Sequence, residues 1–530
     1  MIETWSRSLF VIISVILIII VGAIGAVFPL ALWFYAILVP FIILGVIDMF
    51  QTRKAVLRNF PALGHFRYLL ESVRPEIQQY FIESDSDEHP FSREKRAVVY
   101  RRAKKCMDTL PFGTLRDVNR TGYEWIVHSM KPVKPDKCNC GTTIGKGVCK
   151  QPYQAALLNI SAMSFGALSK NAILALNKGA KRGGFYHNTG EGGISPYHLE
   201  GGADLVWQIG TGYFGCRKAD GSFCQDTFRE RASSLAVVKM IEIKISQGAK
   251  PGHGGILPAA KVSKEISEIR GIPMGEDVIS PPWHSAFGTP VELMEFVAKL
   301  RELSGGKPVG FKICIGNEKE FMSTVKAMLK TGIAPDFITV DGAEGGTGAA
   351  PLEFSNSVGS PLNDGLWFVH NTLVAAGVRD RMKIIAAGKI TTGFHMISKL
   401  ALGADLCNAA RAMMFALGCI QARQCNTNHC PVGVATQDPK LAWGLDIEDK
   451  ASRVANFQAL TVESAIDLFG AAGLKKPCDL GPTHIRKRTG VGQIRRLDEV
   501  YTYLEDGALV HGNVTGRLAD MWEEADADHF

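Results

Sequence analysis

Eight short segments of strand-forming character recur between residues 155 and 420, and helical segments separate most of them. The strand-like segments read AALLNISA, GFYHNTG, ADLVWQIG, IEIKISQ, VGFKICI, DFITVD, KIIAAG and ADLCNAA. Among the helical segments, PVELMEFVAKLRELSG and EFMSTVKAMLKTGI carry apolar residues at i, i+3 or i+4 and i+7, for example Val291, Met294 and Val297. Eight strands alternating with helices over about 250 residues predict a (β/α)8 TIM barrel of the α/β class.

The chain has 530 residues, so a barrel leaves room for additional parts at both ends. We expect a transmembrane hairpin at 1–52, a connector and N-terminal extension at 53–150, the barrel domain at 151–480 and a C-terminal extension at 481–530. In the connector, ESDSDEHPFSREKRAVVYRRAKK is highly charged and predicts exposed helix and loop, whereas FGTLRDVNRTGYEWIVHSM is more strand-like.

The hairpin is predicted from an apolar run at residues 9–47, LFVIISVILIIIVGAIGAVFPLALWFYAILVPFIILGVI, which has no charged residue. One membrane-spanning helix needs about 20 apolar residues, so this run is long enough for two. Gly22, Gly25 and the Phe28-Pro29 pair lie near its middle and indicate a tight turn there.

Cationic residues flank the run on both sides: Arg7 before it, and Arg53, Lys54 and Arg58 after it. Because such flanks favour the cytoplasmic side, we expect both ends of the hairpin there. The predicted location is the cell inner membrane, with the barrel domain facing the cytoplasm. The alternative is a cleaved signal peptide, but the run is too long and no small-residue cleavage pattern follows it.

The net charge of +7 and the pI of about 8.7 are only mildly basic. Lysine and arginine are scattered without a basic block, which argues against nucleic acid as a partner. Twelve cysteines are too few for a disulfide scaffold in a chain of this length.

Half of the cysteines form two groups. Cys419, Cys425 and Cys430 stand in the stretch CIQARQCNTNHCPVG, a C-x5-C-x4-C spacing followed by proline. Three close thiolates indicate an iron–sulfur cluster, and three ligands instead of four favour the 3Fe-4S type. A zinc site lacking a fourth ligand, or unrelated core cysteines, are the alternatives. The second group, Cys138, Cys140 and Cys149, could bind a metal, but its spacing matches no ligand pattern and favours free thiols.

Glycine and polar residues follow nearly every predicted strand, at the end where barrel active sites form. These residues are Met163–Gly166, Asn188–Gly193, Gly210–Gly212, Lys244–Gly252, Lys312, Asp341–Gly348, Gly388–Lys389 and Asn408–Arg411. Glycines at single positions are explained by tight turns, but in eight units together they favour close backbone approach to a ligand.

A phosphate site after strands seven and eight is common in such barrels, and Gly388, Lys389, Ala410 and Arg411 are placed for it. The natural cofactor is flavin mononucleotide (FMN), whose anionic reduced ring would be a partner for the charge of Lys312. The expected cofactor-binding residues are Met163, Ser164, Lys312, Asp341, Gly345, Gly346, Gly388, Lys389, Ala410 and Arg411.

Longer motifs resemble a known family. ISAMSFGALSKNA, NTGEGG, KISQGAKPGHGGILPAAKVS, ISPPWH, DGAEGGTGAAPL, VGSPLNDGL and GCIQARQCNTNHCPVGVATQDPKL are similar to the FMN-binding synthase domain of glutamate synthase. The resemblance covers roughly residues 150 to 480, in order and without large gaps.

The resemblance implies FMN and a 3Fe-4S cluster held by Cys419, Cys425 and Cys430. It implies that the imine of 2-oxoglutarate and ammonia is reduced to glutamate. It also implies that 2-oxoglutarate is held by residues that match Glu191, Lys244, Gln247, Lys250 and Arg270. Electrons would come from a partner such as ferredoxin, since no G-x-G-x-x-G follows a strand and opens a helix.

Three departures from the family pattern bear on function. The chain begins MIETW instead of with a nucleophilic cysteine, so we expect ammonia to be free or supplied by a separate glutaminase subunit. The family's C-terminal β-helix domain is not expected either. His253 and Ile256 stand where the family has Glu and Gln, which leaves open an FMN-dependent oxidoreductase of another small 2-oxo or 2-hydroxy carboxylate. A membrane electron-transfer subunit without catalysis is a further alternative.

Overall fold

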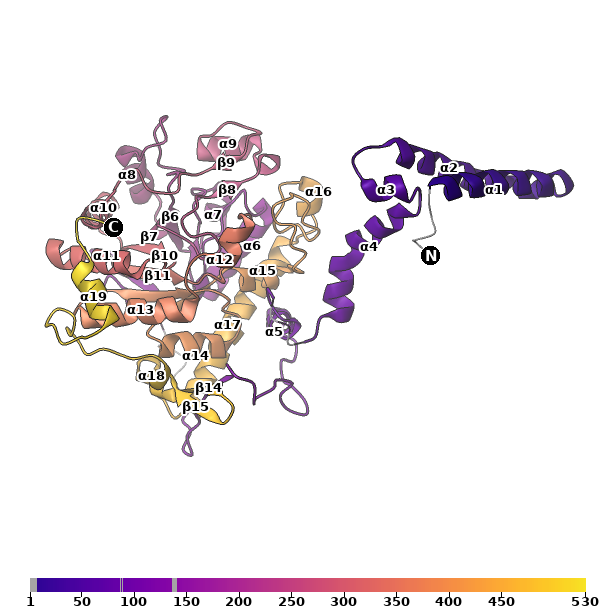
Figure 1. Ribbon diagram of the computed structural model, residues 1–530. Coiled ribbons are helices and arrows are strands. Elements are labelled where there is room, and N and C mark those ends of the chain that lie inside the picture. Colours follow the sequence, from indigo (N-terminus) through magenta and orange to yellow (C-terminus); the bar gives the residue numbers. More distant parts are fainter. Residues whose placement is uncertain (1–6, 86, 88, 136–140) are drawn as a thin grey trace. The chain divides into compact units, whose positions relative to one another are not determined.

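The computed structural model describes residues 7–85, 87, 89–135 and 141–530, which form two compact units divided between Asp87 and Glu88 (Figure 1). Cys138 and Cys140, two of the three cysteines considered for a second metal site, lie outside the described residues.

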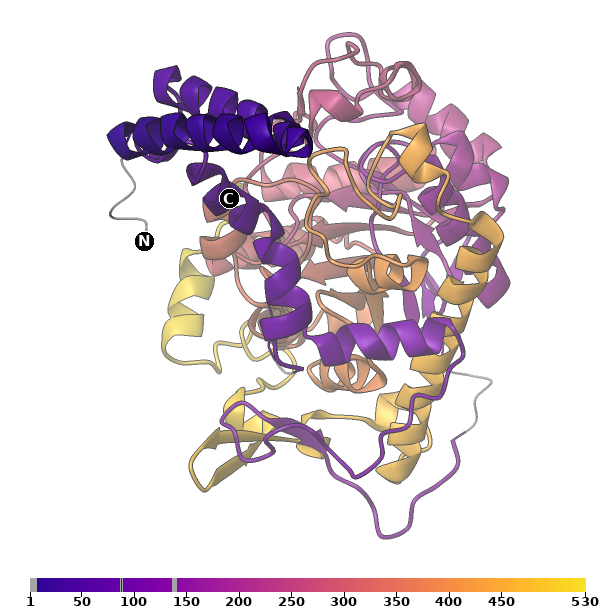
Figure 2. The same cartoon turned by 90° about the vertical axis from the view of Figure 1, so that its right-hand side faces the viewer.

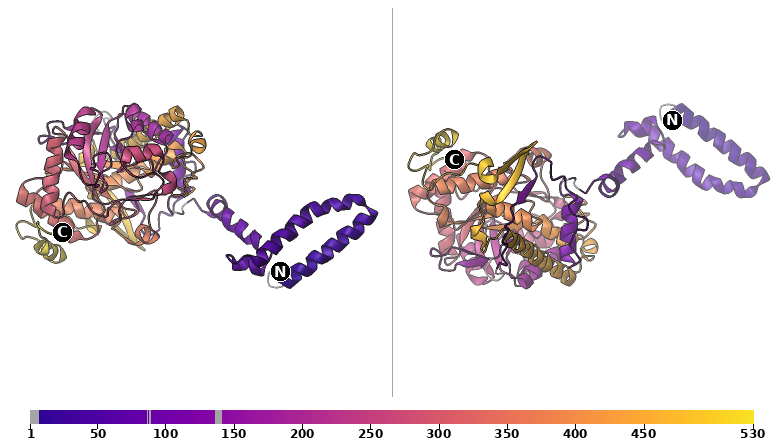
Figure 3. Two further views of the ribbon diagram at one scale, coloured as in Figure 1. Left: turned by 90° about the horizontal axis from the view of Figure 1, so that it is seen from above. Right: turned by 90° about the horizontal axis from the view of Figure 1, so that it is seen from below.

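The first unit is helical. Its elements are α1 (Arg7–Val27), the 3-10 helix η1 (Pro29–Phe34), α2 (Tyr35–Phe50), α3 (Ala55–Asn59), α4 (Gly64–Ile77) and the π-helix η2 (Gln78–Ile82). The α1 helix and the run Pro29–Phe50 are long and apolar enough to cross a membrane, by length and composition. Figure 3 shows them as the two arms of a hairpin.

The turn of the hairpin differs from the prediction in one respect. The chain reverses at Phe28 and Pro29, as expected, but Gly22 and Gly25 lie within α1. A Cβ atom on Gly25 would lie 2.3 Å from Leu32 Cδ2, and one on Gly22 would lie 3.0 Å from the Tyr35 hydroxyl. These glycines therefore permit close packing between the arms and do not make the turn.

The second unit contains a closed barrel of eight strands. The strands are β4 (Leu158–Ile160), β5 (His187–Asn188), β6 (Leu205–Ile209), β7 (Val238–Lys244), β10 (Val309–Ile313), β11 (Phe337–Asp341), β12 (Lys383–Ala387) and β13 (Leu406–Ala409). They follow one another in chain order, all parallel, and β13 pairs with β4 to close the ring. The predicted TIM barrel is confirmed, and each of the eight predicted segments contains or overlaps its strand.

Helices surround the barrel (Figures 1 and 2). The helices of this unit are α5 (Arg93–Ala103), α6 (Lys170–Gly183), α7 (Pro196–Glu200), α8 (Gln225–Ser234), α9 (Lys264–Arg270), α10 (Pro290–Leu303), α11 (Glu318–Thr331), α12 (Leu352–Ser357), α13 (Leu362–Ala375), α14 (Gly393–Ala401), α15 (Arg411–Leu417), α16 (Pro439–Ala442), α17 (Ile447–Ala471), α18 (Leu497–Val500) and α19 (Arg517–Glu524). The 3-10 helices are η4 (Ala259–Lys261), η5 (Arg379–Arg381), η6 (Pro477–Asp479) and η7 (Pro482–His484). The α6 helix begins where the Ser169 hydroxyl accepts from the Ala172 amide, and it ends at Gly184 with φ +70°.

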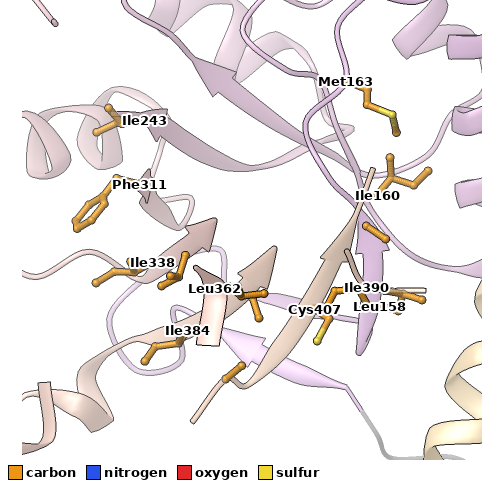
Figure 4. Packing of buried hydrophobic residues seen from close by; sticks show 14 of the residues in the cluster. Leu158, Ile160, Met163, Ile243, Phe311, Ile338, Leu362, Ile384, Ile390 and Cys407 are labelled. Atoms are coloured by element: carbon orange, nitrogen blue, oxygen red, sulfur yellow. The ribbon is translucent and has the colours of Figure 1, made fainter. Parts of the chain in front are cut away.

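Strand alternation separates an apolar layer from a polar barrel interior. Ile243, Phe311 and Ile338 belong to the main apolar core, part of which is drawn in Figure 4. The neighbouring strand residues Glu242 and Lys312 point to the opposite face, because successive side chains alternate along a strand. Toward the C-terminal ends of the strands, the barrel interior is therefore lined with groups that can form hydrogen bonds and ion pairs.

Further short strands of this unit form small sheets outside the barrel. They are β1 (Glu124–Ile126), β2 (Thr142–Ile144), β3 (Tyr153–Ala155), β8 (Ile256–Leu257), β9 (Val278–Ile279), β14 (Ile485–Gly490) and β15 (Gln493–Arg496). Ile144 and Ala155 of the β2–β3 hairpin cluster with Val206, Met240 and Leu406, which lie toward the N-terminal ends of their strands. The hairpin plugs that end, so a ligand site must open at the other.

The charged connector is less exposed than predicted. In α5, Arg96, Val99 and Arg102 are buried, and the Arg102 guanidinium donates to the Thr461 hydroxyl of α17 at 3.3 Å. Figure 2 shows α5 lying across α17. The expectation of exposed helix was wrong here because long cationic side chains can cover apolar surface while their charged ends find partners. The strand-like prediction is confirmed by β1, which pairs with β14.

Candidate active site

A buried carboxylate organises the barrel interior beneath the site. Glu242 of β7 accepts hydrogen bonds from Asn188 Nδ2 at 2.7 Å, Gln208 Nε2 at 2.7 Å and Thr339 Oγ1 at 2.6 Å. These donors come from three other strands, so the carboxylate is satisfied although it is only 1% exposed. Glu242 thus links its own strand to three others through its carboxyl group.

Lys312 of β10 and Asp341 at the end of β11 form a buried ion pair. Lys312 Nζ lies 3.0 Å from Asp341 Oδ2, which also accepts from the Gly248 amide at 3.1 Å. Burial alone would lower the pKa of Lys312, but Asp341 and Glu242 raise it above its ordinary value. Lys312 is therefore a permanent cation at the C-terminal end of the barrel.

A cavity open to solvent lies beside this ion pair and joins most of the predicted cofactor-binding residues. Its lining consists of Phe91, Ser161, Ala162, Gln247, Lys312, Asp341, Gly345, Gly346, Ala387, Gly388, Lys389, Ile390, Asn408, Ala409, Ala410, Arg411 and Ala412. Met163 and Ser164 are absent from this lining. Met163 packs in the apolar core, and the Ser164 hydroxyl lies 3.5 Å from an Arg270 nitrogen.

The cationic side of the cavity is built from β12, β13 and the segment before α5. The Arg411 guanidinium lies 4.7 Å from the ring centroid of Phe91, and Lys389 Nζ lies 5.9 Å from it. Arg411 also donates to the Glu344 carbonyl at 2.5 Å, and burial lowers its pKa to about 10. Two cations thus converge on one wall, where an anionic group would be stabilised.

Glycines allow the loop after β11 to approach these charges closely. A Cβ atom on Gly345 would lie 2.9 Å from Asp341 Oδ1, and one on Gly346 would lie 2.6 Å from Arg411 Nε. No side chain fits at either position without displacing a charged group. The requirement for glycine here is steric, as the sequence pattern suggested.

A second group of charges surrounds Glu191, in the loop after β5. Lys244 Nζ lies 2.6 Å from Glu191 Oε1, and Lys250 Nζ donates to the Ala349 carbonyl at 2.8 Å. Arg270 of α9 donates to the Phe165 carbonyl at 2.9 Å. Lys244, Lys250 and Arg270 are all buried, so three cations share one carboxylate.

The electrostatics of this group are strongly perturbed. Burial lowers the pKa of Lys250 to about 8, although Glu191 opposes the shift, and burial lowers the pKa of Arg270 to about 10. Burial would raise the pKa of Glu191, but Lys244 and the two other cations together lower it. The Arg270 Nε atom is buried and has no hydrogen-bond acceptor among the described residues. The group is therefore short of negative charge and of one acceptor.

His284 forms a hydrogen bond with the backbone of Lys244. Its Nε2 lies 2.9 Å from the Lys244 carbonyl and its Nδ1 lies 3.0 Å from the Tyr213 hydroxyl. A carbonyl only accepts, so Nε2 carries the proton and Nδ1 accepts from the hydroxyl. Burial lowers the pKa of His284 to about 4, which keeps the ring neutral. His284 belongs to the ISPPWH motif, and its role was not predicted.

The two residues that depart from the family pattern lie in the long connection after β7. His253 Nδ1 lies 2.9 Å from the Gly254 carbonyl, and its ring packs edge-on against Phe354 at 5.1 Å. Ile256 begins β8, opposite Ile279. The residue before it, Gly255, faces Glu191, since a Cβ atom there would lie 2.6 Å from Glu191 Oε1.

The three cysteines of the C-x5-C-x4-C stretch follow α15, where Cys419 interacts electrostatically with both Cys425 and Cys430. Burial raises the pKa of Cys419 to about 12. Among the described residues, no three His, Cys, Asp or Glu side chains converge as the ligands of a single metal ion would. The stretch therefore lacks the geometry of a zinc site.

A buried cation faces these thiols. Lys261 is 2% exposed, and its Nζ donates to the carbonyls of Ala167 and Ala435 at 2.9 and 2.8 Å. Cys425 and Cys430 are the groups whose negative charge would stabilise it. The backbone between the cysteines takes positive φ at three non-glycine residues, Gln421, Arg423 and Asn428. Strain of this kind persists when the surroundings hold it in place.

Two contributions to the site could not be read from the sequence. Phe91 lines the cavity although it precedes the first barrel strand by more than 60 residues, and no local pattern marks it. The Tyr100 hydroxyl of α5 donates to the Cys419 carbonyl at 2.6 Å, which joins the connector to the cysteine stretch. Only the packing of α5 against the barrel reveals either contact.

Comparison of the sequence with known proteins identifies its relatives. The conserved region of glutamate synthase matches residues 128–475. The glutamate synthase large subunit-like protein YerD of Bacillus subtilis is 38% identical over 494 residues, which cover 86% of this chain and 93% of YerD.

Two further relatives match a smaller part of the chain. The archaeal glutamate synthase (NADPH) of Methanocaldococcus jannaschii is 38% identical over 63% of this chain and 62% of its own length. The archaeal-type glutamate synthase (NADPH) of Thermotoga neapolitana is 36% identical, over 59% of each chain. The match thus spans about three fifths of these two relatives. The chain belongs to the glutamate synthase family and is a glutamate synthase-like oxidoreductase.

Proposed function

We propose that the protein reduces the imine of 2-oxoglutarate and ammonia to glutamate, using FMN, an iron–sulfur cluster and electrons from a partner protein such as a ferredoxin. The observation that carries this proposal is the group of Lys244, Lys250 and Arg270 around Glu191. A dicarboxylate supplies the negative charge that this group lacks, and a carboxylate oxygen supplies the acceptor missing at Arg270 Nε. Ammonia would enter free or from a separate glutaminase subunit.

Lys250 is suited to move a proton in this reaction. Its pKa of about 8 lies near the operating pH, where a group can both hold and release a proton. Condensation of 2-oxoglutarate with ammonia expels water, and Lys250 Nζ would donate the proton to the leaving hydroxyl. Lys244 stays paired with Glu191 and would orient the substrate.

FMN fits the chemistry of the cavity beside Lys312. Lys389 and Arg411 would hold its phosphate, Gly345 and Gly346 leave the loop free of side chains, and Lys312 would face the ring. When bound, FMN would supply hydride transfer to the substrate carbon. Gln247 lines the cavity, and the next residues of the same connection lead to Lys250, so the two sites adjoin.

A 3Fe-4S cluster suits the three-cysteine stretch, where Cys419, Cys425 and Cys430 would hold it through their thiolates. Lys261 would offset the charge of the anionic group, and the Gln421 amide lies 3.5 Å from Cys419 Sγ as a donor. The cluster would supply one-electron transfer from the partner protein.

We further propose that α1 and α2 anchor the chain in the cell inner membrane with the barrel facing the cytoplasm. Support comes from their length and apolar composition and from the cationic residues at both ends of the hairpin. The electron donor would then be reached from the membrane surface.

The test uses the purified full chain, reduced chemically and supplied with 2-oxoglutarate and ammonium. Glutamate should form, and Lys250→Ala should abolish its formation while the flavin absorbance is retained. Lys264→Ala is the matched control, because this lysine lies on α9 with its side chain 84% exposed. If no glutamate forms although flavin and iron are present, the substrate assignment is wrong.

A second candidate keeps the cofactors and changes the substrate to another small 2-oxo or 2-hydroxy carboxylate. Ile256 and His253 favour it, since an isoleucine in the connection beside Glu191 cannot form the hydrogen bond that a glutamine provides. Assaying the reduced protein with a series of 2-oxo acids and ammonium separates the two candidates.

A further inference from the structure

The helix α4, with η2 directly after it, has an apolar face that no other described element of the first unit covers. At 3.6 residues per turn, the apolar residues from 63 to 77 fall within an arc of about 120°. They are Leu63, Phe66, Leu69, Leu70, Val73 and Ile77. Tyr80, Phe81 and Ile82 of η2 extend the apolar surface.

These side chains are widely exposed. Phe66 is 62% exposed, Leu70 48% and Phe81 84%. Single exposed apolar residues are ordinary on a protein surface, but a continuous patch of this kind marks a site of interaction.

The other faces of α4 are polar, and two arginines border the apolar arc. Arg74 and Arg67 lie next to Leu63 and Leu70 around the helix, and Arg67 pairs with Glu71 at 2.9 Å. Glu71 and Ser72 lie away from the arc, whereas Glu76 borders its other edge, next to Leu69. Aromatic and aliphatic residues with cations along one border are typical of a helix in a membrane interface.

Hydrogen bonds tie the start of α4 to the base of the apolar hairpin. Asp48, near the end of α2, pairs with His65 Nε2 at 2.9 Å and accepts from the Ala62 amide at 3.0 Å. At the start of α1, Arg7 donates to the carbonyl of Arg58 and to Asn59 Oδ1 at 2.7 and 3.1 Å. The segment α3–α4 therefore begins where both candidate spans end.

We propose that α4 and η2 lie in the plane of the membrane interface, with the apolar arc among the lipid chains and Arg67 and Arg74 at anionic headgroups. This inference rests on the proposed insertion of α1 and α2. The occupant is a lipid surface because the patch is continuous with the candidate spans. Arg67 and Arg74 border one edge of the patch, and Arg53, Lys54 and Arg58 precede α4. These cations complement anionic lipid.

Photocrosslinking in the full chain tests the proposal. Leu70→p-benzoylphenylalanine and Phe81→p-benzoylphenylalanine report on the apolar arc, and the same substitution at Glu71 and Ser72 provides matched controls on the polar face. Each protein is placed in nanodiscs of phosphatidylcholine and phosphatidylglycerol, irradiated and analysed by mass spectrometry. We expect several-fold more lipid adduct from the arc positions than from the controls.

Crosslinks from Leu70 and Phe81 to residues 89–530, to a second copy or to another protein would overturn the proposal, as would equal lipid adducts on both faces. The substitution at Ile16 in α1 reports on the hairpin itself. Lipid adducts at Ile16 without any at Leu70 or Phe81 refute the interfacial helix and leave the anchor intact. If Ile16 forms no lipid adduct, the proposed membrane anchor fails.

The role of the arginines has a separate readout. Arg67→Glu combined with Arg74→Glu should lower the lipid adduct from Leu70 several-fold in nanodiscs that contain phosphatidylglycerol. The adduct in nanodiscs of phosphatidylcholine alone should change little, because that surface has no net charge. An equal loss in both lipids would show that the substitutions disrupt the helix instead of its electrostatic contact.

Discussion

We expect the buried charge of Lys250 to lower the free energy of unfolding of the ligand-free protein. The same charge is placed to bind the substrate. Lys250 is 3% exposed, and burial brings its pKa from 10.5 to about 8. The shift corresponds to about 3 kcal/mol of penalty for holding the charge in the folded state. Lys250→Met removes this penalty together with one hydrogen bond to the Ala349 carbonyl, which contributes about 1 kcal/mol.

The variant should therefore be more stable than the wild type by about 2 kcal/mol near pH 7. The pH dependence of this stability difference checks its sign. Between pH 8 and 10.5 the unfolded wild type binds more protons than the folded protein, so wild-type stability rises through that window. The advantage of the variant should shrink across the same window and, near its upper end, turn into a deficit of about 1 kcal/mol, the value of the lost hydrogen bond.

Two measurements on the full chain in detergent would check this prediction. Urea unfolding followed by near-ultraviolet circular dichroism gives the stability difference at several pH values. Calorimetric titration gives the Kd of 2-oxoglutarate, which should weaken roughly 10- to 100-fold in the variant because a charged hydrogen bond is lost. Wild-type binding should weaken above about pH 8, as Lys250 loses its proton.

A variant that is less stable than the wild type near pH 7, or a stability difference that does not change with pH, would refute the reasoning. Lys264→Met should change neither quantity, since its side chain is exposed on the same connection.

Three further predictions concern the cofactor sites. Lys261→Met should lower the reduction potential of the proposed cluster by about 50–100 mV in a redox titration followed by electron paramagnetic resonance, because a buried cation favours the reduced form; an unchanged potential would contradict this role. Gly346→Ala should reduce the FMN content of the purified protein, since the added Cβ lies 2.6 Å from Arg411 Nε, whereas Gly348→Ala, with nothing within 4 Å, should leave it unchanged. Asp341→Asn should destabilise the barrel by about 3–5 kcal/mol in urea unfolding by leaving a buried lysine unpaired; a loss below 1 kcal/mol would show that other groups carry the compensation.

Local patterns predicted the barrel because the spacing of apolar residues in each strand and helix shows which of its faces is buried. The segment DFITVD is strand β11 and EFMSTVKAMLKTGI is helix α11 with little change in bounds, since the period of apolar residues follows directly from which face is buried. The prediction for α5 failed for the same reason. Its charges suggested solvent, but Arg96 and Arg102 are buried against other elements that no local window contains.

The candidate site was predictable where residues follow strand ends. Lys312, Asp341, Gly388 and Arg411 come from four different strand regions, and the parallel barrel brings them to one cavity. What each residue does there depends on its partners. The sequence contained Lys261 within a recognisable motif, but gave no reason to connect it with the cysteines more than 150 residues away.

The sequence by itself determined the order of strands and helices, the apolar hairpin and the residues at the C-terminal end of the barrel, because these follow from periodicity, composition and strand direction. Only the tertiary structure decided that three buried cations share Glu191, that His284 holds Lys244 in place and that Phe91 forms a cavity wall. Charge balance and hydrogen-bond satisfaction are properties of groups that meet in space. They are set by contacts between distant segments, and no local pattern records them.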